Sequence, residues 1–160
     1  MKNIITLTTQ NVPGVLAKIS GVLRRKLFNI ESLTVGITSN PEKARFTIIV
    51  SEDMRETEKV AVTIEKMIEV LHIKILNPKH TICREIVLAK LKIIDAKDQS
   101  ILEEIEEDIL VKELYKSGHE VCIELIDTSQ NLNKFLERIL KNNIEVLEWV
   151  RSGVIAVEKN

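Results

Sequence analysis

The sequence predicts an α+β fold made of two tandem βαββαβ modules. Over the first half of the 160 residues, strand-like apolar runs and segments of helical periodicity follow one another in the order β-α-β-β-α-β. The same order returns in the second half, without a detectable sequence repeat. A polar stretch with a proline, Asn77–His80, lies between the two. We therefore expect one domain over residues 1–77 and a second over residues 78–160.

The first module starts with an apolar strand and a turn that ends at Gly14. Pro13 suits the first helical position, because its fixed φ fits a helix and its missing N–H is not needed there. Apolar residues then recur at helical spacing, with Gly21 inside the helix, either simply tolerated or admitting another backbone closely. Two β-rich runs around a polar turn predict a hairpin, and a longer helix and a short strand follow. The expected strands are residues 2–9, 29–38, 44–51 and 72–76, and the expected helices are residues 13–27 and 52–71.

The second module repeats this plan and has the connectivity of ferredoxin-like domains. Isoleucines four residues apart mark its first helix, and a dense apolar stripe marks its second. A Ser117-Gly118 turn separates its two middle strands, and Ser152-Gly153 interrupts the last one. The expected strands are residues 85–94, 110–115, 120–126 and 144–157, and the expected helices are residues 97–109 and 130–141.

Composition limits the functional classes. The net charge is −1 and aromatic residues make up 3%, so neither a basic field nor stacking side chains favour nucleic acid. We find no signal-peptide pattern and no apolar run of membrane-spanning length, so we expect a cytoplasmic protein that does not bind membranes. Cys83 and Cys122 are far apart in strand-like contexts, and we expect buried thiols rather than a disulfide.

Catalytic chemistry has little support in the sequence. His80 and Cys83 have a metal-ligand spacing but lack a second ligand pair. The five glycines do not cluster into a phosphate loop, and no serine has an evident His/Asp partner. The acidic run over residues 103–108 fits a solvated helix face better than a metal site. We expect no catalytic residue, metal or cofactor in this chain.

A small-molecule carboxylate has a candidate site in the first module. Free backbone amides at the helix start, near Gly14 and Val15, would receive a carboxylate with the help of the helix dipole. The side-chain amides of Asn11 and Asn29 are able to donate to a carboxylate and accept from an ammonium group. Asn11 as a turn or cap residue, and Gly14 as a turn glycine, are equally good explanations from these residues alone.

Several separated motifs carry a family resemblance. They are the segment 11–35 with Asn-Ile-Glu-Ser-Leu-Thr-Val at its end, residues 40–48, Glu69-Val70-Leu71, Arg84-Glu85-Ile86-Val87-Leu88 and Val150-Arg151-Ser152-Gly153-Val154. In this order they resemble the small, regulatory subunit of acetolactate synthase (acetohydroxyacid synthase), which opens with an amino-acid-sensing ACT domain. Residues 97–116 and Trp149 depart from the family pattern.

The resemblance implies a homodimer whose ACT domains pair side by side, with valine bound between them. It places the loop of one protomer against the start of the second strand of the other. The implied valine-binding residues are Asn11, Pro13, Gly14, Val15, Leu16, Asn29 and Ile30. It also implies a separate catalytic subunit that carries thiamine diphosphate, magnesium and FAD, and a role in branched-chain amino-acid biosynthesis.

Two other functions fit parts of the sequence. An orphan ACT-type sensor of a different enzyme would share the N-terminal site but does not predict the motifs at residues 84–88 and 150–154. A small ferredoxin-like enzyme would need an acid–base or nucleophile set, which the sequence does not show.

Overall fold

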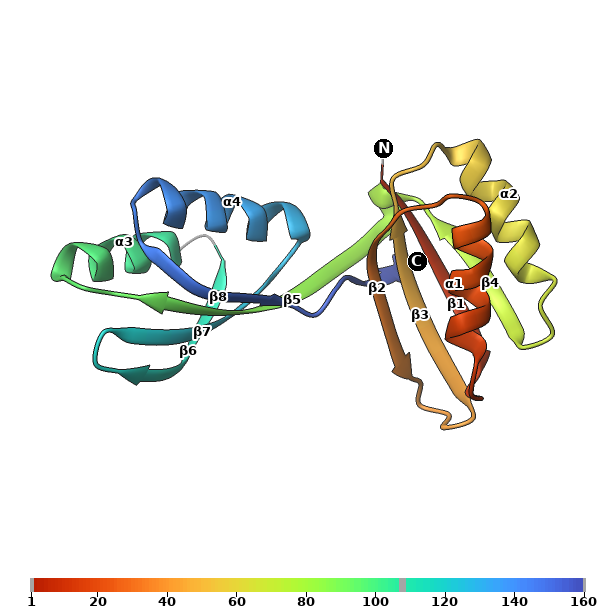
Figure 1. The fold of residues 1–160 in the computed structure, drawn as a ribbon, viewed down its shortest axis with the longest axis horizontal. Helices are drawn as coiled ribbons and strands as arrows, with labels where there is room; N and C mark the ends of the chain where they lie inside the picture. Colours follow the sequence, from red (N-terminus) through yellow and green to blue (C-terminus); the bar gives the residue numbers. More distant parts are fainter. Residues whose placement is uncertain (1, 107–108, 160) are drawn as a thin grey trace. The chain divides into compact units, whose positions relative to one another are not determined.

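The computed structural model describes residues 2–106 and 109–159, and of Ile105 and Glu106 the backbone only. Contacts divide the chain into two units (Figure 1). Unit 1 runs to Ile82 and takes up the chain again from Val154, and unit 2 is Cys83–Gly153. The sequence placed the boundary at residues 77 and 78, so this division lies five residues later and returns the C-terminal residues to unit 1.

Unit 1 is a four-stranded antiparallel sheet in the order β2-β3-β1-β4, with two helices on one face (Figure 1). The core lies between the helices and the sheet, because Leu7, Phe46 and Ile48 from the strands meet Ile19, Leu23 and Ile64 from the helices. The predicted βαββαβ order is confirmed. The elements are β1 (Asn3–Gln10), α1 (Val15–Arg25), β2 (Ile30–Ile37), β3 (Lys43–Val50), α2 (Met54–Glu65) and β4 (Val70–Leu76).

Two expected boundaries in unit 1 are wrong. The helix predicted to reach Leu71 ends at Glu65, because Val70 pairs with Thr9 as the first residue of β4. Met67 still packs against the core from the intervening turn, which explains its helical spacing. Pro13 is not the first helical residue: α1 begins at Val15, and Pro13 lies in the turn before it.

The face of the unit 1 sheet opposite the helices is covered by the C-terminal segment Val154–Glu158. Its backbone N–H at Val154 donates to Ser32 Oγ on β2 at 2.9 Å, and Glu158 pairs with Lys74 on β4. Four residue steps in a strand cover about 14 Å, the width of three inter-strand spacings, so the segment crosses the sheet from edge to edge. The sheet residues of this face are buried: Ile4, Thr6, Thr47, Ile49 and Leu76.

The covering strand, β9 (Ile155–Glu158), pairs with β5 (Thr81–Lys92), which follows a short 3-10 turn, Pro78–His80. Val154 and Ala156 are buried in this layer. The predicted interruption at Ser152-Gly153 is confirmed, since β8 and β9 are separate strands and Gly153 takes a φ of 84°.

Unit 2 repeats the plan with a sheet in the order β6-β7-β5-β8, where β5 begins four residues earlier than predicted. Its core is formed by Val87, Leu91 and Ile123 from the sheet against Leu132, Phe135 and Ile139. Trp149, which departed from the family pattern, stacks on Phe135 with ring centroids 6.4 Å apart. Its further elements are α3 (Ala96–Glu106), β6 (Leu110–Ser117), β7 (Glu120–Asp127), α4 (Ser129–Lys141) and β8 (Glu145–Arg151).

The helix predicted to end at Ile109 ends at Glu106, and the acidic run over 103–108 lies partly outside the described residues.

Cys83 and Cys122 are free thiols, as predicted, but both are half-buried rather than buried. Burial raises the pKa of the Cys83 thiol. In the described ranges no helix is long and apolar enough to cross a membrane.

Candidate functional site

The loop between β1 and α1 is anchored to the turn between β2 and β3. The backbone N–H of Asn11 donates to the Glu42 carbonyl at 2.8 Å, and its side-chain Nδ2 donates to the Pro41 carbonyl at 2.9 Å. Asn11 therefore has the turn role that the sequence left open. A primary amide has two N–H donors and an acceptor oxygen, so one such bond leaves groups for a ligand.

Gly14 sets the start of α1. Its φ of 87° is in the left-handed region that favours glycine, and its carbonyl accepts the first helical bond, from Lys18 N at 3.0 Å. No side chain caps the amides of the first turn of α1, and no acidic residue lies there. By contrast, Asp53 caps α2 and Thr128 caps α4. The first turn of α1 thus presents uncapped N–H groups at the positive end of the helix dipole.

The space beside these amides is open. A Cβ placed on Gly14 would meet nothing within 4 Å. Val15 turns its side chain into the core, whereas Leu16 is exposed, and Val12 and Pro13 are exposed on the other side of Gly14. The backbone at Gly14 is therefore open on the side where a side chain would stand.

A hollow of about 550 Å³ lies on the outer face of α1 at the start of β2. Asn29 is exposed there and Ile30 is half-buried. Gly21 faces this hollow, and the nearest atom to an added Cβ would be Arg25 Nη1 at 3.9 Å, so the described part of the chain brings no second backbone against it. The lining residues are Ala17, Ser20, Gly21, Arg24, Phe28, Asn29 and Ile30.

Charged groups flank both parts of the candidate site. Glu31 is hydrogen-bonded to Lys2 and to Ser51, and these bonds hold the pKa of its carboxyl below the ordinary value. Glu69 forms an ion pair with Lys18 in the second turn of α1, and this bond lowers the pKa of Glu69 in the same way. Both carboxylates thus have cationic partners within the chain.

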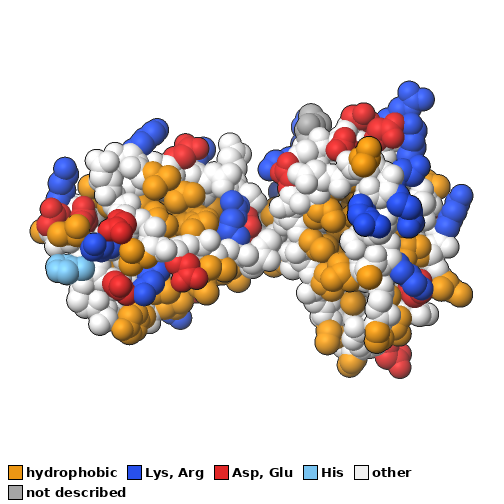
Figure 2. Space-filling view, in the orientation of Figure 1, with side chains coloured by type: hydrophobic (Ala, Val, Ile, Leu, Met, Phe, Trp, Pro, Cys, Tyr) orange, Lys and Arg blue, Asp and Glu red, His pale blue; other side chains and the backbone are white. Residues whose placement is uncertain are grey.

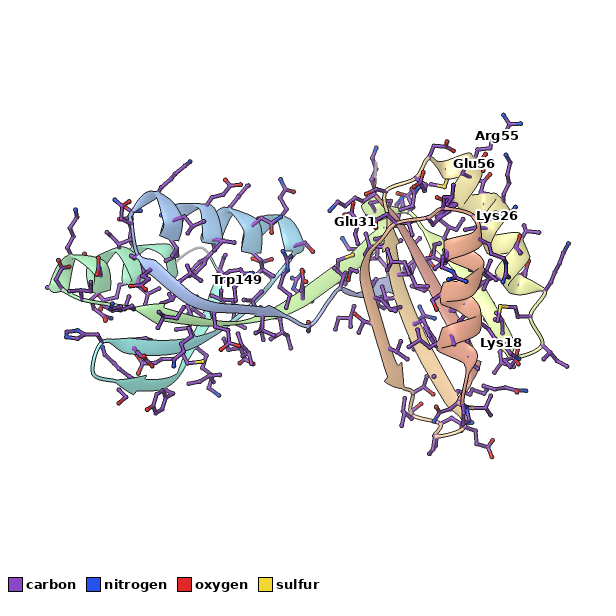
Figure 3. All side chains as sticks on the ribbon, in the orientation of Figure 1. Lys18, Lys26, Glu31, Arg55, Glu56 and Trp149 are labelled. Atoms are coloured by element: carbon purple, nitrogen blue, oxygen red, sulfur yellow. The ribbon has the colours of Figure 1, made fainter. Side chains whose placement is uncertain are left out.

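The structure does not bring the two groups of predicted site residues together. Asn11, Pro13, Gly14, Val15 and Leu16 lie at the start of α1, and Asn29 and Ile30 lie beyond its end. The 11 residues of α1 separate them by about 16 Å. Figure 3 shows this separation, with Lys18 near one end of the helix and Lys26 at the other.

A buried polar network in unit 2 was missed at the sequence level. The carboxylate of Glu85, 4% exposed, accepts from Arg151 Nε at 2.9 Å and Nη2 at 2.5 Å, and from Ser129 Oγ at 2.7 Å. Burial by itself would raise the pKa of Glu85, but these bonds outweigh it and hold the pKa below its ordinary value. Arg151 also donates to Asn133 Oδ1 at 2.8 Å.

This network unites two of the separated sequence motifs. Glu85 belongs to the motif at residues 84–88 and Arg151 to the one at residues 150–154. Beside them, Ile86 and Ser152 exchange two hydrogen bonds, at 2.9 and 3.0 Å. The sequence held one signal of this burial. Glu85 has the same place in the strand alternation as Val87, Ala89 and Leu91, so it points to the inward face with them.

Metal ligation has no candidate in the described residues, which contain no cluster of three or more His, Cys, Asp or Glu side chains. His80 and Cys83 gain no further ligand of these types there.

Comparison with known proteins identifies the family. The profile for the AHAS small subunit-like ACT domain matches residues 5–72, and that for the small subunit of acetolactate synthase matches residues 84–160. The acetolactate synthase small subunit of Haemophilus influenzae is 32% identical over 99% of this chain and 96% of its own length. The probable small subunit of Methanothermobacter thermautotrophicus is 29% identical over 98% and 92%, respectively.

A solved structure agrees with these sequence matches. The crystal structure of the acetolactate synthase small subunit from Thermotoga maritima matches with a TM-score of 0.89 and 25% identity, over 100% of this chain and 98% of the other. Profiles, relatives and fold therefore agree over both units, and the chain belongs to the family of acetolactate synthase small subunits, whose role is regulatory rather than catalytic.

Proposed function

We propose that this chain binds the catalytic subunit of an acetolactate synthase, raises its activity and makes it sensitive to valine. The observation that carries the valine site is the uncapped start of α1 beside the left-handed Gly14. Matches over both units favour this function over an orphan ACT-type sensor of another enzyme, which predicts only the first. We place thiamine diphosphate, magnesium and FAD on the catalytic subunit, and the complex in the cytoplasm.

Homodimerisation of unit 1 supplies the second half of the site. β2 is an edge strand of its sheet, and a free edge invites pairing with another strand. A two-fold axis that keeps all helices on one side of a continuous sheet pairs the two β2 strands antiparallel. Such pairing sets the start of β2 in one protomer beside the end of β2 in the other.

The antiparallel arrangement also brings the two groups of site residues together. The end of β2 leads into the turn that holds Asn11, so the loop Asn11–Leu16 lies at that end of the strand. Across the two-fold axis it meets Asn29 and Ile30 of the other protomer. The residues that one chain keeps about 16 Å apart thus form one site in a dimer.

Valine matches the groups at this site. Its carboxylate would accept from the amides of the first turn of α1, and its ammonium would donate to the side-chain oxygen of Asn29. Burial of its isopropyl group beside Ile30 would contribute about 2 kcal/mol. Feedback then requires that valine bind the inhibited arrangement of the holoenzyme more tightly than the active one.

Calorimetric titration of the purified chain tests the site. We expect one L-valine per chain, because a two-fold interface contains two equivalent sites. Valinamide, which keeps the ammonium and the isopropyl group but lacks the carboxylate, should not bind measurably. Equal binding of valine and valinamide would place the ligand away from the helix start.

A further inference from the structure

Leu27 takes a backbone conformation that its side chain disfavours. It has a φ of 61° and follows α1, where its N–H donates to Arg24 O at 3.0 Å and Phe28 N donates to Leu23 O at 3.0 Å. This pair of bonds is the Schellman ending of a helix, whose left-handed residue is usually glycine or asparagine. In unit 2 the same ending after α4 has Asn143, with a φ of 58°.

The side chain of Leu27 has almost no burial among the described residues of its own unit to offset this conformation. It is 88% exposed, the largest exposed fraction among the large apolar residues of the described chain. The left-handed strain is a cost that a glycine would remove, and the exposed side chain has almost no burial to offset it. A contact with another molecule would bury the side chain of Leu27 and so give it a role.

The position of Leu27 in unit 1 indicates that the other protomer makes this contact. Leu27 stands immediately before Phe28, Asn29 and Ile30, which line the hollow at the start of β2. Under the antiparallel pairing of β2 strands, and therefore resting on the proposed function, this end of one protomer meets the loop end of the other.

The loop end carries apolar side chains that also lack cover. Val12 is 46% exposed, Leu16 is 45% exposed and Ile37, at the end of β2, is 68% exposed. Apolar side chains gather at this end of the unit, the lower end in the view of Figure 2. One two-fold operation brings Leu27 and these residues together twice, so the surface is self-complementary.

We propose that Leu27 is a specificity-determining residue, which closes the effector site over the ligand side chain from the neighbouring protomer. Packed beside the partner's Val12 and Leu16, it forms an apolar wall opposite Ile30. The wall fits the short isopropyl group of valine and leaves little room for the longer side chains of leucine and isoleucine. The left-handed backbone of Leu27 thus positions its side chain at the effector site and does not stabilise unit 1.

The variant Leu27→Gly tests this assignment, with Val62→Ala on α2 as the control that removes an exposed apolar side chain elsewhere in unit 1. Calorimetry with valine, leucine and isoleucine, at protein concentrations where sedimentation shows both variants to be dimers, gives three dissociation constants each. We expect Leu27→Gly to weaken valine binding about five- to tenfold and to reduce the preference for valine over leucine. The melting temperature of its monomer, at concentrations below dimerisation, should be unchanged or higher.

The outcomes are separable. Valine affinity and preference equal to those of the unmodified chain would overturn the assignment to Leu27 and leave the proposed valine site intact. Absence of valine binding by the unmodified chain would overturn the proposed function and this assignment with it. Loss of affinity together with a lower melting temperature of the monomer would also contradict the assignment, because it indicates a role in the fold.

Discussion

Replacing Gly14 by aspartate and by asparagine separates the charge of the effector site from its shape. The two side chains have nearly the same size, and both tolerate the left-handed region better than other residues. A Cβ at Gly14 meets nothing within 4 Å, so the Cβ of neither variant clashes with the described residues. The remaining cost is conformational, because φ is 87°, and amounts to about 1 kcal/mol for each variant.

The difference between the two variants is electrostatic. We take the aspartate carboxylate and the carboxylate of a valine bound at the amides of α1 to be about 4 to 5 Å apart for a Coulomb estimate. At an effective dielectric constant of about 20 this repulsion amounts to 3 to 4 kcal/mol, or roughly a few hundred-fold in affinity. Either side chain also competes for the amides by capping the helix, and this loss is common to both variants.

Calorimetry with L-valine, next to thermal unfolding, measures both effects. We expect Gly14→Asn and Gly14→Asp to melt within a few degrees of each other, whereas only Gly14→Asp loses valine binding below detection. Equal valine affinity in the two variants would refute the placement of the effector carboxylate at the start of α1.

Three other predictions concern stability. Glu85→Gln should destabilise unit 2 by about 2 to 3 kcal/mol, because it removes the charge that faces the Arg151 guanidinium. Since the pKa of Glu85 is lowered by folding, its contribution is complete above the ordinary carboxyl pKa of about 4.3 and is lost as the pH falls through the lowered value. Urea unfolding followed by the fluorescence of Trp149, the single tryptophan, should therefore show a smaller acid destabilisation in Glu85→Gln. Val154→Asp should destabilise unit 1 by about 3 kcal/mol or more, because it buries a charge against the sheet, and hydrogen exchange of β1 amides measures this loss. Leu27→Gly should stabilise unit 1 of the monomer by up to about 1 kcal/mol in chemical unfolding, because the relief of left-handed strain exceeds the entropy cost of glycine.

Matched variants give each of these predictions a control. Val157→Asp changes a residue of the same segment that is 66% exposed, and it should leave the exchange of unit 1 nearly unaltered. Equal effects of Val154→Asp and Val157→Asp would argue against the covering layer. Asn143→Gly should be close to neutral, since asparagine already suits the left-handed position. A Glu85→Gln protein as stable as its parent at pH 7 would show that the Arg151 bridge contributes little.

The order of elements was predictable because most of them have strong local periodicity. The stripes of α1 and α4 and the β-rich strands around polar turns are complete within a few residues, and the structure confirms them. The end of α2 was not predictable in this way. Met67 continues the helical spacing, but Val70 is held in β4 by its pairing with Thr9, some 60 residues earlier in the chain.

Long-range arrangements had no local signal either. The four residues Ile155–Glu158 alternate as a strand would, yet nothing in them indicates that they cross the sheet of unit 1. The bridge between Glu85 and Arg151 joins residues 66 positions apart, and only the inward register of Glu85 hinted at it. Gly14 was singled out correctly as a backbone position, whereas its left-handed conformation displaced Pro13 from the helix.

The candidate site itself rested on the family resemblance more than on its residues. Local reasoning left Asn11 between a turn role and a binding role, and the structure gives it the turn contact with Pro41. The seven proposed residues lie at two ends of one helix, so no argument within a single chain would have joined them. In our proposal the two groups of residues come together only when two protomers pair.

Acetolactate formation by the catalytic subunit from the same source, titrated with this chain in the presence and absence of valine, tests the central claim most directly. We expect the chain to raise the rate to a plateau and valine to reverse that stimulation. Stimulation that valine leaves unchanged would contradict the effector site while retaining the partner. Absence of any stimulation would contradict the proposed regulatory function itself.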